Sequence, residues 1–331
     1  MYMKKIVLFG AWVLCASTLF AERRVEYLPY GNMDTWTVRH IKESGLLGGA
    51  TKVLHAVGPN DTIRENKAYE PVAGNPWACS ETYAAKVIVE AGAGGAVIPE
   101  RRGNGYCCRL ENKMTHVKIG DIYAVVTGAI FLGKKYEPVG LIGKYRPHTV
   151  IDVGIPFTKQ PVALMLDYKA VISDSCYITS TARDKPVRVD GEHDCGEIYI
   201  YLQHRWEDPE TGEIYARRVG TACERVCETI PEWVNNHEIP VRYGNITTDP
   251  NFKPYEAIGY TMMMTRNSKG KMVQIQEVGY SLDKPTHIVL MIASGCSGAF
   301  RAHEGNKLWV DNIRLVYDDE EHPAKTPAKK H

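Results

Sequence analysis

The stretch KLWVDNIRLVYDD, residues 307–319, has the pattern of a long β-strand. Successive side chains of a strand point to opposite faces, so one face is expected to carry Trp309, Asp311, Ile313, Leu315 and Tyr317. Four of these five side chains are large and apolar or aromatic, and the fifth is a carboxylate. A buried carboxylate without a partner is strongly destabilising. The fold must therefore supply a partner for Asp311.

Similar strand patterns recur along the chain, separated by Gly, Pro, Asn and Asp, as in sandwiches and barrels. The clearest lie at residues 85–91, 106–112, 122–133, 162–173, 197–205, 239–243, 272–281 and 286–295. The run IVLMIAS, residues 288–294, is apolar on both faces and predicts a central strand. In residues 197–205, Ile198, Ile200 and Leu202 should form a core face opposite an aromatic, polar face.

The composition also favours an all-β protein. The 331 residues include 19 Tyr, 29 Gly and 18 Pro, which suit short strands and turns, and helix-favouring runs are scarce. The formal charge is only +1, which gives no reason to expect nucleic acid or an anionic membrane as a partner. The oligomeric state is not indicated by the sequence.

The N-terminus has the layout of a secretory signal peptide over residues 1–21, with a basic start, an apolar run and Ala21 before a charged residue. Lipidation at Cys15 is a less favoured alternative, because the residues before it are bulky. We expect export to the periplasm, the cell surface or the medium, and no membrane span in the mature chain. The remainder divides into a segment over residues 22–29, a domain over 30–318 and a disordered, basic tail over 319–331.

Export makes disulfides possible for the eight cysteines that remain after Cys15 is removed. Eight cysteines allow 105 pairings, and the sequence does not choose among them. One pair has a local argument, because Cys176 and Cys195 flank a turn-rich insert between two predicted strands. If these strands are antiparallel neighbours, a Cys176–Cys195 disulfide would close the loop. A metal site is less favoured, since no CxxC pair or Cys/His ladder is present.

Several segments, in this order and spacing, resemble a known family. They are YGNMDTW (30–36), CCRLEN (107–112), GAIFLGKKYEPVG (128–140), DVGIPFTKQPVALMLDYKAVIS (152–173), DCGEIYIYL (194–202), EWVNNHEIPVRY (232–243), IASGCSGAF (292–300) and NKLWVDNIRLVY (306–317). Together they resemble the putative carbohydrate metabolism domain of exported Bacteroidetes proteins, over residues 30–317. Met33 and Asp34 depart from the Phe and Glu that are usual in that family.

The resemblance implies a jelly-roll β-sandwich of two antiparallel sheets, similar to galactose-binding-like carbohydrate-binding modules. It also implies a role for Asp311. The carboxylate would accept backbone hydrogen bonds from the incoming N-terminal segment, which we favour, or would hold a structural calcium with Asn32 and Asp34. Ligand binding or catalysis by Asp311 is a third alternative. No other cofactor is expected.

Sugars are bound by stacking on aromatic rings and by hydrogen bonds to polar side chains. One candidate platform is the sheet face of Tyr199, Tyr201, Gln203 and Arg205, ending at Trp206. The alternative, that the tyrosines pack under a second layer, is favoured. The loop residue Trp77 could bind a ligand or plug the end of the sandwich.

Three hypotheses for the function follow. The first is an exported, non-catalytic domain that binds a carbohydrate. The second is a glycoside hydrolase with a carboxylate pair, although no pair is marked by its sequence surroundings. The third is a structural or adhesive cell-surface protein without a small ligand. The sequence contains no GxSxG, HExxH, P-loop or Rossmann glycine pattern that would indicate another enzyme class.

Overall fold

The computed structural model describes residues 23–117, 122–140, 147–174, 176–178, 185–297 and 301–318. In these ranges the regular secondary structure consists of strands and three short 3-10 helices, Gly45–Leu47, Pro147–Val150 and Pro254–Glu256, so the predicted all-β fold is confirmed. None of these helices has the length and apolarity needed to cross a membrane. The predicted signal peptide and the predicted C-terminal tail lie outside the described residues.

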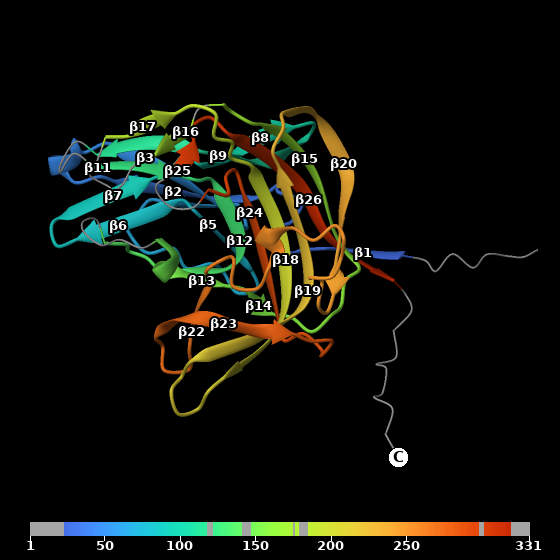
Figure 1. The fold of residues 1–331 in the computed structure, drawn as a ribbon. Coiled ribbons are helices and arrows are strands. Elements are labelled where there is room, and N and C mark those ends of the chain that lie inside the picture. Colours follow the sequence, from blue (N-terminus) through green and yellow to red (C-terminus); the bar gives the residue numbers. More distant parts are fainter. Residues whose placement is uncertain are drawn as a thin grey trace, which may run out of the picture.

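Two large sheets form the body of the molecule (Figure 1). The six-stranded sheet contains β20 (Ile230–Pro240), β15 (Ala163–Val171), β26 (Lys307–Asp318), β9 (Gly105–Glu111), β8 (Val97–Arg102) and β1 (Arg23–Tyr27). The ten-stranded sheet contains β13 (Ile151–Val153), β12 (Ala129–Lys135), β24 (His287–Ala293), β18 (Gly196–Glu207), β19 (Ile214–Val226), β23 (Met272–Tyr280), β22 (Met264–Arg266), β14 (Ile155–Pro156), β21 (Arg242–Tyr243) and β5 (Trp77–Cys79). All pairs in these two sheets are antiparallel except β19 with β23.

Four smaller sheets complete the described structure. They are β3 (Thr51–Val57) with β2 (Trp36–Lys42) and β4 (Asp61–Ile63), β6 (Thr82–Lys86) with β7 (Val89–Ala93), β10 (Lys113–Val117) with β11 (Ile122–Val126), and β16 (Cys176–Ile178) between β17 (Val187–Val189) and β25 (Arg301–His303). A strand predicted over residues 85–91 is wrong, because the chain reverses between β6 and β7. Val87 lies in this turn with a φ of 53° and 97% of its surface exposed.

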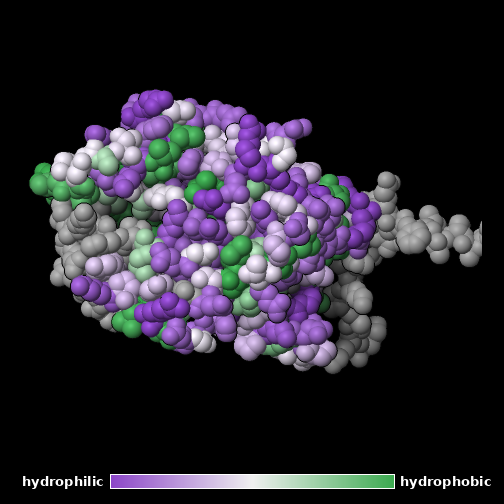
Figure 2. Space-filling view, turned by 90° about the horizontal axis from the view of Figure 1, so that it is seen from above, coloured by the Kyte–Doolittle hydropathy of each residue, from purple (hydrophilic) through white to green (hydrophobic). Residues whose placement is uncertain are grey.

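The main core lies between the two large sheets. The ten-stranded sheet contributes Ile198, Ile200 and Leu202, as the alternation in residues 197–205 predicts. The predicted central strand is β24, which pairs with β12 on one side and β18 on the other. Packed sheets are thus present, and the jelly-roll connectivity stays a prediction. The space-filling view in Figure 2 shows a largely hydrophilic face with small, separate apolar patches.

Strand β26 does not keep the simple alternation that its sequence predicts. Leu308 and Val310 point into the main core, and so do Ile313, Leu315 and Tyr317. The inward set changes from even to odd positions because Asn312 adopts a left-handed conformation (φ 52°) where the register with β15 also shifts. The bulge turns Trp309 and Asp311 to the other face of the sheet. The carboxylate is therefore not part of the apolar row.

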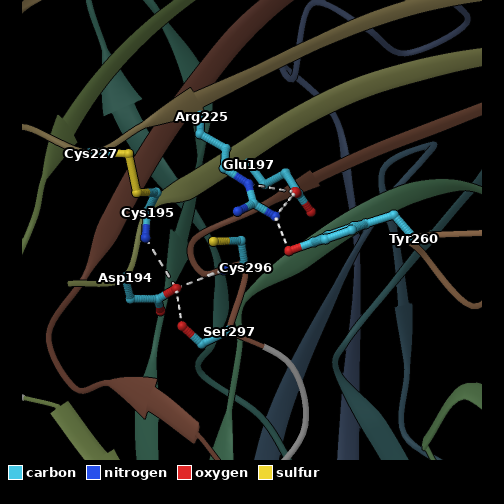
Figure 3. The surroundings of a disulfide bond; sticks show 8 residues. All are labelled: Asp194, Cys195, Glu197, Arg225, Cys227, Tyr260, Cys296 and Ser297. Atoms are coloured by element: carbon cyan, nitrogen blue, oxygen red, sulfur yellow. Dashed lines mark hydrogen bonds and ion pairs between the residues drawn. A yellow bond between two sulfur atoms is a disulfide. The ribbon is translucent and has the colours of Figure 1, made fainter. Parts of the chain in front are cut away.

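The one disulfide among the described residues joins Cys195 to Cys227 (Figure 3). The predicted Cys176–Cys195 pairing is wrong, and Cys176 is a buried free thiol. Cys176 lies on β16, which pairs with β17 and β25 and not with β18. Cys195 directly precedes β18 and Cys227 directly follows β19, and Gly196 faces Val226 in the ladder. The disulfide thus closes the open end of the β18–β19 hairpin.

Peptide mapping under non-reducing conditions should therefore yield a fragment that links Cys195 to Cys227. The other six cysteines of the described chain should be alkylated after denaturation without reduction, because each is free. A Cys195 peptide linked to any other cysteine would contradict this assignment. Reduction before digestion is the control, since it should release the two peptides.

Candidate functional site

Tyr199 and Tyr201 do not form an open platform, because their rings are not accessible, and the favoured alternative of packing under a second layer agrees with the structure. Tyr199 and Tyr201 are only 2% and 1% exposed, and their rings stack on each other at 4.5 Å. A second apolar cluster covers this face of the ten-stranded sheet, with Met263 and Ile275 among its members. The guanidinium of Arg218 lies 3.5 Å from the centre of the Tyr201 ring. These tyrosines therefore belong to a second core.

Two other predicted ligand residues are also buried. Trp77 is 1% exposed, and its indole nitrogen donates to the carbonyl oxygen of Pro29 at 2.6 Å, so it plugs the sandwich. Gln203 is fully buried and donates to Glu277 while it accepts from Arg205 Nε. Gln203 can act on a ligand only by positioning Arg205.

The remaining two predicted residues, Arg205 and Trp206, line a cavity of about 240 Å³. The end of β18, the start of β19, strand β22 and the start of β24 form it, and its other lining residues are Glu207, Ile214, Thr265, Arg266 and His287. In Figure 1 strand β22 lies at the end of the molecule opposite β16 and β17. No local sequence pattern indicates Thr265, Arg266 or His287 as part of this cavity, since they come from distant parts of the chain.

An aromatic surface lies beside this cavity on the opposite face of the ten-stranded sheet, because Trp206 directly follows Arg205 in β18 and points the other way. Trp206 is 41% exposed, and its ring stacks on Tyr215 at 5.8 Å with an interplanar angle of 20°. The two residues face each other across β18 and β19, which explains the stacking. The guanidinium of Arg217 lies 5.9 Å from the Trp206 ring. An exposed, fixed indole of this kind is suited to stack on the C–H face of a sugar.

Polar groups surround the cavity. His287 accepts or donates one hydrogen bond through Nδ1 to Thr286, and burial followed by repulsion from Arg205 lowers its pKa to about 4, so the ring is neutral at pH 7. Glu207 accepts two hydrogen bonds from Ser268, which lower its pKa. Thr265 donates to Asp152 at 2.7 Å. The cavity therefore offers fixed donors and acceptors of the kind found in small-ligand sites.

Asp311 has a counter-charge in the structure. Its Oδ2 accepts from Arg102 Nη1 at 2.6 Å, and its Oδ1 accepts from the backbone N–H of Asn312 at 2.7 Å. Among the residues from Arg23 onward that the structure describes, the predicted backbone bond from the N-terminal segment to Asp311 is not made. The chain ends are instead joined by backbone bonds, such as the one from Ile313 N–H to the Gly31 carbonyl oxygen at 2.8 Å.

Asn32 and Asp34 bond to each other at 2.9 Å, and Asp34 also accepts from the backbone N–H of Tyr106. Among the described residues, no three His, Cys, Asp or Glu side chains are grouped as a metal ion would require. A calcium site at Asn32, Asp34 and Asp311 stays a prediction. In the structure a guanidinium occupies the position beside Asp311 that a cation would take.

A second carboxylate, Asp167, also binds Arg102 Nη1, at 2.9 Å, and faces Asp311 across β15 and β26. Burial raises the pKa of Asp311. The pKa of Asp167 is lowered overall despite its burial, by hydrogen bonds from the backbone of Asn236 and from Asn312 and by Arg102. Diverging carboxylate pKa values are a feature of glycosidases. Here, however, one arginine binds both acids and itself lies 3.8 Å from the Trp233 ring centre, so the cluster ties strands together.

A second, smaller cavity of about 20 Å³ lies near Glu81, Lys135 and Glu137. It has room for a water molecule and not for a sugar ring. Glu137 stabilises the fold, since it accepts hydrogen bonds from the guanidinium of Arg39 and from the backbone N–H groups of Tyr69 and Tyr83.

Most of the chain is similar to a known protein family. The family model for the "Putative carbohydrate metabolism domain" matches residues 61–316. The chain belongs to this family. No curated protein matches the chain.

Two solved structures are similar to it. A putative glycoside hydrolase from Bacteroides thetaiotaomicron shares 17% identity, with 86% of this chain and 72% of that chain covered and a TM-score of 0.43. A putative glycoside hydrolase from Bacteroides vulgatus shares 13% identity, with 88% and 94% covered and a TM-score of 0.42. At these values neither carries an argument about the reaction. Family membership therefore relates the chain to carbohydrate metabolism and leaves the choice between binding and hydrolysis to its own residues.

Proposed function

We propose that this protein is an exported carbohydrate-binding domain and that a sugar residue stacks on the exposed ring of Trp206. The observation that carries the proposal is the half-exposed indole of Trp206, which stacks on Tyr215 at the surface of the ten-stranded sheet. Membership of a carbohydrate-metabolism family supports the choice of a sugar as the ligand. The sugar would stack on Trp206 while its hydroxyl groups bond to neighbouring polar side chains such as Arg217.

Replacement of Trp206 by alanine should weaken binding about 10- to 30-fold, because it removes the stacking surface. A glycan array with the purified protein would identify ligands, and calorimetry on the best ligand would measure the loss. Tyr27→Ala is the matched control. Tyr27 is 52% exposed but lies on β1, in the other large sheet, so its loss should leave binding unchanged.

The same experiment separates binding from hydrolysis and from a structural role. Release of a shorter sugar from the bound ligand would favour the glycoside hydrolase, and the search for its carboxylates would begin with Glu207 at the cavity. Equal binding by Trp206→Ala and the parent protein would place the ligand elsewhere. Failure to bind across diverse glycans would favour a structural or adhesive protein.

A further inference from the structure

A free thiol, that of Cys296, lies next to the Cys195–Cys227 disulfide (Figure 3). The backbone N–H groups of Cys195 and Cys296 both donate to Asp194 Oδ1, at 3.0 and 2.9 Å. Two nitrogens that share one acceptor at these distances are at most about 6 Å apart, which is comparable to the Cα separation of disulfide-bonded cysteines. Cys195 therefore has a second cysteine within its reach.

The order of the strands explains this arrangement. Cys195 directly precedes β18, which lies between β19 and β24 in the ten-stranded sheet. On the β19 side the ladder ends next to Cys227. On the β24 side the ladder ends at Ala293, three residues before Cys296. Cys195 therefore has Cys227 on one side and the segment of Cys296 on the other.

Asp194 holds the segment that carries Cys296 against the start of β18. The residue is 1% exposed, and its Oδ1 also accepts from Ser297 Oγ at 2.7 Å, while Oδ2 accepts from Asn112 at 3.3 Å. Gly295 allows this close approach, since a Cβ there would lie 2.6 Å from Asp194 Oδ2. The buried carboxylate therefore keeps the free thiol beside the disulfide.

The other free cysteines of the described chain are placed differently. Cys223 is partly exposed, like Cys296, but it faces Tyr199 in the ladder, four residues along β18 from Cys195. At about 3.3 Å per residue this is about 13 Å along the strand, which is too far for a disulfide. The remaining four are buried and lie on other strands, namely Cys79 on β5, Cys107 and Cys108 on β9, and Cys176 on β16.

The groups around the Cys296 thiol set its reactivity. Burial raises its pKa to about 11, and Asp194 and Glu197 act in the same direction, while the backbone N–H of Cys195 and the guanidinium of Arg225 oppose the shift. The thiolate is the form that attacks a disulfide. Attack by Cys296 is therefore slow at pH 7 and becomes faster as the pH rises.

We propose that Cys296 is a second partner for Cys195 and that thiol–disulfide exchange transfers the disulfide from Cys227 to Cys296. The Cys296 thiolate attacks the sulfur of Cys195, so that an S–S bond forms between these two residues while the Cys195–Cys227 bond breaks. Cys227 leaves as a thiolate and takes up the proton that Cys296 released. The exchange involves no net oxidation or reduction and needs no other reactant.

The exchange changes both the covalent link and the accessible thiol. It frees the open end of the β18–β19 hairpin and ties β18 to the segment that follows β24. Cys296 is partly buried, whereas Cys227 is exposed. The new isomer therefore presents a fully accessible surface thiol, which none of the six free cysteines of the described chain provides before the exchange.

Peptide mapping of the parent protein tests this exchange. The purified protein is incubated without denaturant or added thiol at pH 6, 8 and 9, returned to pH 6, treated with N-ethylmaleimide and digested. A Cys195–Cys296 peptide and alkylated Cys227 should appear together at the higher pH values. They should form about tenfold faster at pH 9 than at pH 8, because the thiolate fraction of a group with a pKa of about 11 rises in this proportion.

Three variants refine the assignment. Cys296→Ser should abolish both signals, whereas Cys223→Ser, the matched control at another partly exposed cysteine, should leave them unchanged. Cys227→Ser removes the competing partner. After treatment with oxidised glutathione, this variant should contain Cys195–Cys296 as its internal disulfide.

The outcomes on the parent protein decide the proposal whether or not each variant folds. A map that shows only Cys195–Cys227 at every pH would overturn it. Cys195 linked to Cys223 or to a buried cysteine would also overturn it, because such links require unfolding. Exchange that persists in Cys296→Ser would remove the role given to this thiol. None of these results bears on carbohydrate binding at Trp206.

Discussion

Replacement of Glu277 by alanine is expected to lower the free energy of unfolding by about 3–5 kcal/mol, because it leaves a charged arginine in the protein interior. The side chains of Glu277 and Arg218 are each 1% exposed, and they form two hydrogen bonds, at 2.6 and 2.5 Å. Burial alone would raise the pKa of Glu277, but Arg218 lowers it overall, so the acid is ionised at pH 7. Without this carboxylate, Arg218 keeps its charge and loses its counter-ion.

Chemical denaturation of the parent and the variant measures this loss. The double variant Glu277→Ala/Arg218→Met should be more stable than Glu277→Ala alone, because it removes the unpaired charge as well. Lys159→Ala is the surface control. Lys159 and Glu26 are 49% and 44% exposed, and breaking such a pair should cost less than about 1 kcal/mol. A loss for Glu277→Ala no greater than that of the control would show that the pair does not contribute as described.

Much of the fold could be predicted because alternation and apolar runs reflect burial directly. The central position of β24 follows from the apolar run in residues 286–295, and the core face of β18 follows from the alternation in residues 197–205. Strand β26 shows where this reasoning fails. One left-handed residue, Asn312, reverses the faces of the strand, and an Asn in a strand pattern does not by itself reveal that conformation. Trp309 and Asp311 consequently lie on the opposite face from Ile313 and Leu315.

The candidate site shows a different limit. The sequence predicts that Tyr199 and Tyr201 share a face, and their stacking agrees with this. Alternation cannot tell whether a second layer covers that face, and here Met263 and Ile275, from a later part of the chain, do so. Trp206, near the end of the same strand, keeps 41% of its surface exposed.

The wrong prediction of the disulfide has a similar cause. Cys195 has a plausible partner in Cys176 if the intervening insert is a simple loop, but that insert contains β16 and β17, which belong to another sheet. In both cases, the buried tyrosines and the disulfide, the outcome depends on which distant segments lie next to each other, and a local sequence pattern does not reveal this.

Glu81 gives the second prediction with a large effect. The residue is 2% exposed, and its Oε1 accepts from the backbone N–H groups of Ala96 and Val97, while its Oε2 is buried without a partner. Burial raises its pKa from 4.5 to about 7, and the two hydrogen bonds oppose this shift only in part. The folded protein therefore binds a proton at Glu81 that the unfolded chain releases between pH 4.5 and 7.

The direction in which stability changes with pH follows from this difference in bound protons. Below pH 4.5 both states are protonated, and the contribution of Glu81 is fully present. Between pH 4.5 and 7 the folded state holds more protons, so stability falls as the pH rises, by about 3 kcal/mol in total. Glu81→Gln keeps the Oε1 acceptor and cannot ionise. The difference in unfolding free energy between variant and parent should therefore grow across this window and stay constant above pH 7.

Denaturant unfolding of both proteins at pH 4.5, 6 and 8 would measure this difference, and subtraction cancels the histidines and other groups that titrate in the same range. The control is Glu65→Gln, because the side chain of Glu65 is 74% exposed and its replacement should give a difference that does not change with pH. If the Glu81→Gln difference were equally flat, the two hydrogen bonds and the charge of Lys135 would have to cancel the effect of burial on this carboxylate. A difference that shrinks with rising pH would reverse the sign and show that the folded state favours the ionised form.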